Sequence, residues 1–94
     1  MHVVCKYTIN HGVLNSFLLP QGAVVRAVGC QRSGLQMWVE QSYTHESCEP
    51  RVFVAYFTGE PIVHDPQKLT YVGTTQRSDD YGHDIVAHVY EVLP

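Results

Sequence analysis

Short runs of β-branched and aromatic residues recur along the chain, and turn-forming residues separate them. Such runs are typical of strands, whereas Gly, Pro, Asn and Asp interrupt strands. Within residues 35–41, apolar residues alternate with Gln36, Trp38 and Glu40, which is the two-residue period of a half-buried strand. The pattern predicts seven strands, at residues 3–9, 13–19, 23–30, 35–41, 51–58, 69–76 and 85–92.

No segment keeps the 3.6-residue period of a helix, so the chain is predicted to be all-β. We expect one domain over residues 1–94, a small antiparallel β-sandwich or barrel of about seven short strands. Residues 23–41 predict a hairpin with a four-residue loop, and residues 42–50 and 77–84 predict polar loops. Gly73 predicts a bulge or a close backbone approach. The predicted core consists of Val4, Val25, Val28, Leu35, Met37, Val39, Phe53, Ala55, Phe57, Val72, Val86 and Val89.

Length and composition limit how much surface this chain can bury. A chain of 94 residues buries only roughly 60–65% of its unfolded surface. Hydrophobic residues make up 45% of the sequence and charged residues 16%, against about 25% charged in a usual protein. The balance argues against disorder and leaves apolar surface for a partner. We therefore expect self-association into a homo-oligomer.

The charge and the cysteines exclude several classes of protein. The formal net charge is −3 with six Lys and Arg residues, so no basic face for duplex nucleic acid is expected. No apolar run approaches the roughly 20 residues that cross a membrane, and the first residues do not resemble a signal peptide. Cys5, Cys30 and Cys48 are odd in number and far apart, which fits neither a disulfide framework nor a zinc knuckle. A reducing, cytoplasmic location is the expectation.

Six short motifs, in order along the chain, together resemble a known family. They are KY at 6–7, PQGA at 20–23, LQMW at 35–38, TGEPI at 58–62, YVGT at 71–74 and HVYE at 88–91. The chain resembles a family of small phage and prophage proteins catalogued only as a domain of unknown function. The resemblance implies a viral or prophage protein in a host bacterial cytosol, and it supplies no catalytic residues. The loop 41–50, with Tyr43, His45 and Cys48, departs from the family pattern.

Two groups of residues suggest catalysis or metal binding. Asp79, Asp80, His83 and Asp84 could supply oxygen and imidazole ligands to a divalent metal, but their spacing matches no known metal motif. A solvated loop is the stronger interpretation. His88, alone on a strand, could act as a general base, although a core or edge histidine satisfied by a backbone carbonyl is more common. No nucleophile elbow, phosphate loop or dinucleotide motif is present, so neither an enzyme nor a bound cofactor is predicted.

A third group combines aromatic rings, cations and small hydroxyl residues on predicted strands. Bases stack on aromatic rings at roughly 1–3 kcal/mol each, and arginine binds phosphate with paired hydrogen bonds. On residue types alone, however, ordinary core packing or cross-strand pairs are the stronger interpretation of the same aromatics. The ligand-binding candidates are Lys6, Tyr7, Arg26, Trp38, Arg51, Tyr56, Thr58, Gly59, Tyr71, Thr74 and His88.

The functional hypothesis combines this third group with the phage resemblance. The leading expectation is a non-enzymatic binding protein, a counter-defence sponge that sequesters a nucleotide-derived immune second messenger. The alternative is a protein–protein inhibitor or phage accessory protein without a small-molecule ligand, which would use an exposed strand edge. A small metal-dependent hydrolase that uses His83, His88 and the Asp79–Asp80 pair comes third.

Overall fold

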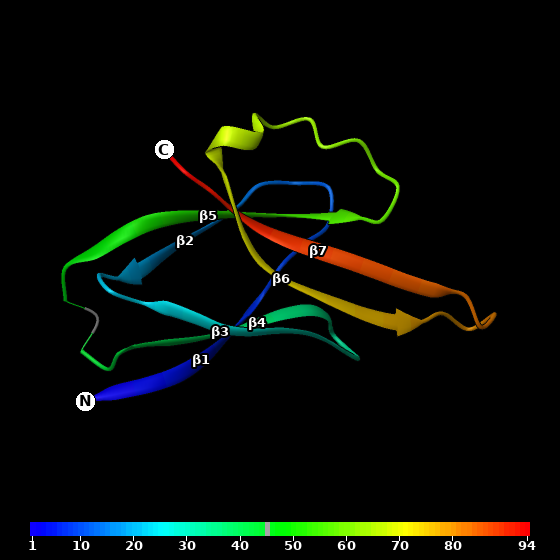
Figure 1. The fold of residues 1–94 in the computed structure, drawn as a ribbon. Helices are drawn as coiled ribbons and strands as arrows, with labels where there is room; N and C mark the ends of the chain where they lie inside the picture. The colour runs from blue at the N-terminus through cyan, green and yellow to red at the C-terminus, as the bar shows by residue number, and fades with distance from the viewer. Residues whose placement is uncertain (45) are drawn as a thin grey trace.

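The computed structural model describes residues 1–44 and 46–94, and most of this backbone lies in strands. Over the described residues, seven strands follow one another, with one short 3-10 helix before β6 (Figure 1). The elements are β1 His2–Thr8, β2 Asn15–Pro20, β3 Val24–Gln31, β4 Gly34–Ser42, β5 Cys48–Phe57, η1 Pro66–Lys68, β6 Leu69–Ser78 and β7 Asp84–Val92. The predicted all-β class is confirmed, and every predicted strand is present.

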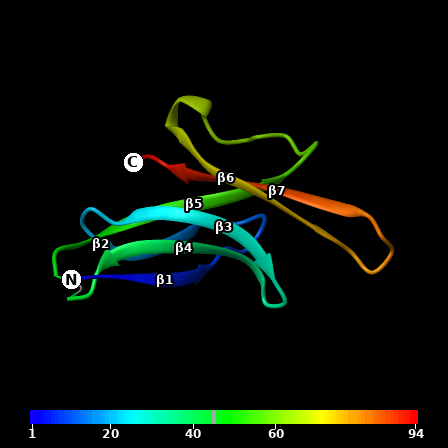
Figure 2. The ribbon, with the colours of Figure 1, turned by 60° about the horizontal axis from the view of Figure 1, so that its bottom comes forward.

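The strands form two antiparallel sheets that pack as a sandwich (Figure 2). The first sheet has the order β1-β4-β3, and the second has the order β2-β5-β7-β6. The chain passes from the first sheet to the second after β1, returns after β2, and stays in the second sheet from β5 onwards. Each sheet therefore contains strands that are distant in the sequence.

The hydrophobic core lies between the two sheets. Of the predicted core residues, Met37, Val39, Phe53, Ala55 and Val89 are fully buried in it, and Val25, Val28, Leu35 and Val72 pack partly buried against it. Ile9, Leu19 and Ala23 complete the buried cluster.

Two residues predicted for the core lie on outer faces instead. Val4 is 55% exposed, because it is the cross-strand neighbour of Glu40 on the outer side of the first sheet. Val86 adjoins the buried Ala87, so the alternation of the strand turns Val86 outward. Phe57 is only half-buried, because it lies at the end of β5 where the core opens.

The loops differ from the prediction in length. Gln31 pairs with Gly34, so the β3–β4 hairpin has a two-residue turn instead of four. Ser78 pairs with Asp84, so the predicted loop 77–84 is shorter than expected. The predicted loop 42–50 is also shorter, because β5 begins at Cys48. His45, which the sequence places in a loop peculiar to this chain, lies outside the described residues.

The two sheets come closest along β3 and β6, which contact each other. Gly73 of β6 faces Val28 of β3, and a Cβ atom on Gly73 would lie 2.8 Å from Val28 Cγ2. Both strands carry a bulge here, between Val25 and Ala27 in β3 and between Tyr71 and Gly73 in β6. Both parts of the prediction for Gly73, a bulge and a close approach, are confirmed.

The β6–β7 hairpin extends beyond the end of the first sheet (Figures 1 and 2). The molecule is correspondingly long, with extents of 44 × 30 × 16 Å. Its radius of gyration is 13.9 Å, against about 12 Å for a compact chain of this length. The overhang leaves the inner surface of the hairpin uncovered at one end of the sandwich.

We expect Gly73→Ala to lower the free energy of unfolding by about 1–3 kcal/mol, because the new methyl group overlaps Val28. The Val28→Ala change removes the overlapping atoms, so the double variant should lose less stability than the sum of the two single changes. Urea denaturation of the four proteins measures this coupling. Strict additivity would show that the two residues do not touch.

Candidate functional site: the recess between the sheets

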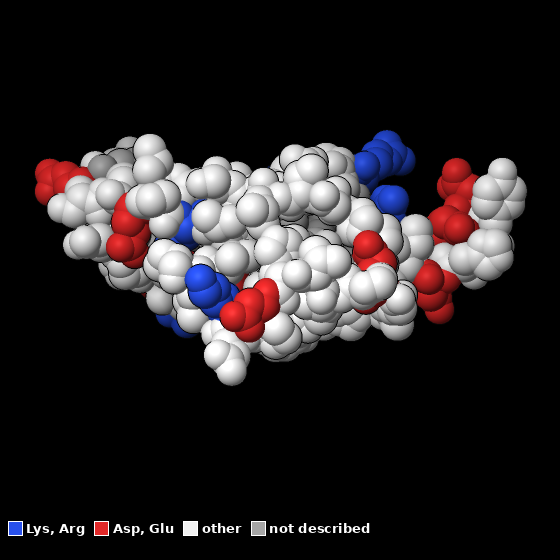
Figure 3. All heavy atoms as spheres, turned by 90° about the horizontal axis from the view of Figure 1, so that it is seen from above, with Lys and Arg blue, Asp and Glu red and all other residues white. Residues whose placement is uncertain are grey.

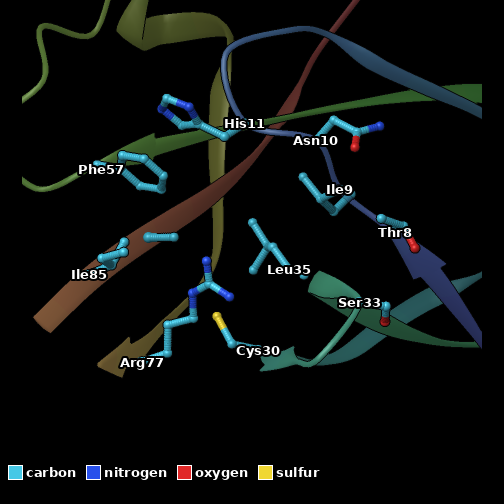
Figure 4. A pocket seen from close by; sticks show the side chains of 12 residues that line it. Thr8, Ile9, Asn10, His11, Cys30, Ser33, Leu35, Phe57, Arg77 and Ile85 are labelled. Carbon is cyan, nitrogen blue, oxygen red and sulfur yellow. The ribbon is translucent and has the colours of Figure 1, made fainter. Parts of the chain in front are cut away.

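A recess of about 240 Å³ opens between the sheets at the end where the β6–β7 hairpin overhangs (Figure 4). Strands of both sheets contribute to it, together with the segment that follows β1. Ile9, Leu35, Phe57, Ile85 and Ala87 give it apolar walls. Its remaining lining residues are Thr8, Asn10, His11, Cys30, Ser33, Gly34 and Arg77.

One wall of the recess is built by His11 and Phe57. Their rings stack in parallel, with centroids 3.7 Å apart and planes inclined by 1°. His11 Nε2 lies 2.5 Å from Glu60 Oε1, and the same oxygen accepts the backbone N–H of Phe57 at 2.5 Å. These two hydrogen bonds hold the pKa of Glu60 below its ordinary value, the backbone donor having the larger effect. The carboxylate thus holds the His11 ring and the Phe57 backbone, and the stacked rings lie side by side as a result.

Arg77 supplies the positive charge at this recess. It stands opposite Ile85 on the inner face of the projecting hairpin, and its guanidinium group points into the recess (Figure 4). Among residues 1–44 and 46–94, no carboxylate lies within ion-pair distance of Arg77. Within the described part of the chain, Arg77 acts on a carboxylate only through the longer-range effect of its charge on Asp79.

A buried glutamine holds the opposite rim. The Oε1 atom of Gln36 accepts the hydroxyl of Thr8 at 2.9 Å, and its Nε2 atom donates to Ser33 at 3.0 Å. Gln36 is fully buried, so an unpaired amide there would be costly. This network fixes Thr8 and Ser33, two hydroxyl residues that line the recess.

The structure separates the eleven ligand-binding residues that the sequence suggests into three places. Lys6, Arg26 and Trp38 lie on the outer face of the first sheet. There the Trp38 ring lies over Gly29, Arg26 pairs with Glu40 at 3.1 Å, and Lys6 donates to Gln31 at 3.0 Å. Both cations on this face are already bound within the chain.

A second group comes together on the outer face of the second sheet, but none of the cations that the hypothesis combined with it lies there. His88 is central, since its Nε2 lies 2.7 Å from the Thr58 hydroxyl and its Nδ1 lies 3.0 Å from the Thr74 hydroxyl. Tyr71 extends this array through its hydroxyl, 2.5 Å from that of Thr74. Both nitrogens of His88 are therefore paired with neighbouring hydroxyls, and not with the backbone carbonyl that the sequence led us to expect.

Two further candidates adjoin this array. Tyr56 is 7% exposed and its hydroxyl binds His64 Nδ1, so the ring is covered by the segment that follows β5. Gly59 adopts a φ of 92° in the turn at the end of β5, a conformation that favours glycine.

The last two candidates are inside the sandwich, so their prediction as ligand contacts is not supported by their positions. Tyr7 packs on Phe17 and donates its hydroxyl to Gln41 at 2.8 Å. Arg51 is held by Glu91 through two contacts of 2.7 Å, and it donates to the carbonyl of Ala23 at 2.5 Å. Glu91 raises the pKa of Arg51 further above its ordinary value, and the pair is structural.

A second hollow, of about 390 Å³, lies beside this ion pair. Its lining is mostly apolar, from Leu14, Pro50, Val52, Val92 and Leu93. Its arginine is the one already bound to Glu91. It therefore lacks the uncommitted cation that distinguishes the recess.

The acidic residues that the sequence suggested as metal ligands stabilise the β6–β7 turn through hydrogen bonds. Oδ1 of Asp79 accepts the backbone N–H groups of His83 at 2.8 Å and Tyr81 at 2.9 Å, which fixes the β6–β7 turn. The His83 hydrogen bond is the main cause that lowers the pKa of Asp79. Asp84 accepts the Ser78 hydroxyl at 3.1 Å. Within the described part of the chain, no group of three or more ligand residues is arranged to hold a metal ion.

Figure 3 shows acidic side chains gathered at the projecting end of the molecule, where the hairpin tip carries Asp79, Asp80 and Asp84. Arg77 lies at the base of this tip. Its charge is the weakest of the effects that lower the pKa of Asp79. Arg77 thus places one positive charge at the recess, beside an acidic hairpin tip.

Sequence reasoning missed most of the recess. The sequence predicts Leu35 and Phe57 for the core, and it does not predict His11, Cys30 or Arg77 as ligand contacts. They come from different strand ends, so no local motif joins them. One signal in the sequence could have placed Arg77 at the recess. Gly73, Thr75 and Arg77 are spaced two residues apart on one strand, so Arg77 lies on the same inner face as Gly73.

The fold and the recess define a small all-β sandwich protein with a preformed hollow between its sheets. The chain matches, over residues 1–94, the family described as Domain of unknown function (DUF7352), and it belongs to that family. No curated protein and no solved structure matches the chain. In the described part of the chain, no helix has the length and apolar character needed to span a membrane.

The wall formed by Glu60 generates a pH prediction. Because the folded-state pKa of Glu60 is lowered, its carboxylate stabilises the fold above about pH 4.5, and this contribution is lost as the pH falls below that value. Glu60→Gln should therefore be less stable than the natural chain at pH 6, and the difference should narrow toward pH 3. Chemical denaturation of both proteins at several pH values measures this difference in the free energy of unfolding.

The matched control is Glu46→Gln, which removes one exposed carboxylate from the β4–β5 loop. For this control, the difference in the free energy of unfolding from the natural chain should not change between pH 6 and pH 3. If the stability difference for Glu60→Gln stayed constant from pH 6 to pH 3, the carboxylate would not hold the His11 and Phe57 rings as described.

Proposed function

We propose that this chain is a non-catalytic binding protein that takes a small nucleotide-type ligand into the recess between its sheets. The observation that carries the proposal is the uncommitted Arg77 guanidinium at the edge of a hollow with apolar walls. Apolar walls with a few convergent polar groups are the usual composition of small-molecule sites. A guanidinium group suits phosphate, which it binds with two parallel hydrogen bonds.

The size of the recess limits what enters it. Its volume of about 240 Å³ is below the roughly 300–1,000 Å³ of pockets that enclose drug-sized ligands. We therefore infer that one planar base enters between Leu35 and Phe57, while the phosphate remains at the rim on Arg77. A cyclic dinucleotide would place one base inside and leave the second outside.

Several features support binding without chemistry. His11 is held by Glu60 and stacked on Phe57, so its Nε2 is not directed to a nucleophile. Among the described residues, no hydrogen bond joins the Cys30 thiol to a base. In the phage or prophage setting that the sequence resemblance implies, sequestration of a nucleotide-derived second messenger of host immunity is the role that such a protein would have.

Thermal shift against cyclic di- and trinucleotides, mononucleotides and ADP-ribose derivatives tests the proposal. A ligand at 100 times its Kd should stabilise the fold by about 2.7 kcal/mol. Arg77→Gln should abolish the shift, whereas Arg26→Gln, which removes the same charge from the outer face of the first sheet, should preserve it. Chromatography of the ligand after heat release should return it unchanged.

Three results would contradict the proposal. The first is a panel in which no nucleotide raises the melting temperature. The second is an equal loss of the shift in both arginine variants, which would point to general electrostatics. The third is recovery of an altered ligand, which would make the protein an enzyme.

A further inference from the structure

The outer edge of β2 is an unpaired strand edge without charge. In the second sheet β2 pairs with β5 on one side, and no strand of the described chain pairs with its other side. Its sequence, NSFLLP, contains no charged residue. Natural edge strands usually carry charges that prevent pairing with another chain, and the edge strand β1 carries Lys6. Leu18 of β2 is also 70% exposed.

The register shows which backbone groups of β2 face outward. The N–H of Thr58 donates to Val86, so even-numbered residues of β5 direct their backbone groups toward β7. Odd-numbered residues of β5 therefore bond to β2, and their partners there are Asn15, Phe17 and Leu19. The intervening residues Ser16 and Leu18 direct their N–H and C=O groups to the open edge.

Pro50 agrees with this assignment. It is the cross-strand partner of Leu18 and has no N–H, so a hydrogen-bonded pair between the two would lack one of its bonds. Pro20 ends the usable edge, because it lacks an N–H and its carbonyl accepts the N–H of Ala23. Two residues, Ser16 and Leu18, thus offer a complete set of two donors and two acceptors.

We propose that β2 is a dimerisation edge that pairs antiparallel with β2 of a second copy, about a two-fold axis at Phe17. Ser16 of one copy then faces Leu18 of the other, and each of these two pairs forms two backbone hydrogen bonds. Centring at Leu18 would place Ser16 against Pro20, which has no N–H, and centring at Ser16 would place Leu18 against Leu14, which lies outside β2. The two second sheets become one continuous eight-stranded sheet.

The side chains agree with this arrangement. On the outer face, each exposed Leu18 covers the small Ser16 of the other copy. On the inner face, the two Phe17 rings meet, and each already packs on Tyr7 and Phe53 of its own chain. The recess lies on other strands, so this inference goes beyond the proposed function and does not depend on it.

A disulfide trap tests the register. Directly opposed residues in a hydrogen-bonded antiparallel pair have Cα atoms about 5.5 Å apart, within the range of roughly 4.4–6.8 Å that a disulfide needs. Ser16→Cys and Leu18→Cys chains, each with Cys48→Ser, are mixed and oxidised. The mixture should give a covalent heterodimer in high yield, and each chain alone should give little. Equal yields from the single chains and the mixture would overturn the register.

Sedimentation over a concentration series tests the dimer itself. The natural chain should shift from monomer to dimer as the concentration rises. Leu18→Lys should remain monomeric, because it brings two like charges to the edge, and Val4→Lys, at an exposed position on the edge strand β1, should dimerise normally. A natural chain that stays monomeric throughout, or a Leu18→Lys chain that dimerises as the natural chain does, would overturn the proposal.

Discussion

The contact between Val28 and Gly73 determines how the two sheets meet. Facing sheets usually lie about 10 Å apart, because side chains from both fill the space between them. A strand position without a side chain removes part of that filling, so β3 and β6 approach until Val28 meets the Gly73 backbone. The bulges in both strands lie beside this contact and adjust the direction of each strand. Among the described residues no hydrogen bond joins β3 to β6, so packing alone closes this side of the sandwich.

The recess follows from that closure and from unequal strand lengths. β6 has ten residues and continues past the contact, whereas β3 ends at Gln31 and turns back into β4 within two residues. The inner face of the hairpin then lacks a covering strand, which exposes Arg77 and Ile85 at the end of the core. A short chain with a thin core would ordinarily fill such a space with side chains. Here Glu60 instead fixes His11 against Phe57, and Gln36 fixes Thr8 and Ser33, so the opening is preformed.

The sequence was sufficient for the strands and for most of the core, because alternation and turn residues are local signals. It was insufficient where apolar residues occupy neighbouring positions, as in β1 and in β7. Val86 and Val89 differ by three positions and so cannot share a face, and only contact with the other sheet decides which of them is buried. The candidate site could not be predicted for the same reason, because the sequence does not show which face of a strand is buried. Trp38, Tyr56 and Arg51 all lie on strands, yet they occupy an outer face of the first sheet, the outer side of the second sheet and the interior.

Arginine positions show most clearly why residue type alone does not define a site here. Arg26, Arg51 and Arg77 all lie on strands, but two of them have carboxylate partners, Glu40 and Glu91, that are brought close only by cross-strand pairing. The exposed Arg26 pair contributes little to stability, whereas Arg51 satisfies a largely buried carboxylate and a carbonyl. Arg77 differs because Asp79 and Asp84, the acidic residues near it, are engaged by the β6–β7 turn, and no carboxylate of the described chain lies within ion-pair distance of it. A cation that the fold leaves unpaired beside an apolar hollow keeps its binding capacity for a molecule from outside, and for that reason the recess is the stronger candidate than the aromatic faces.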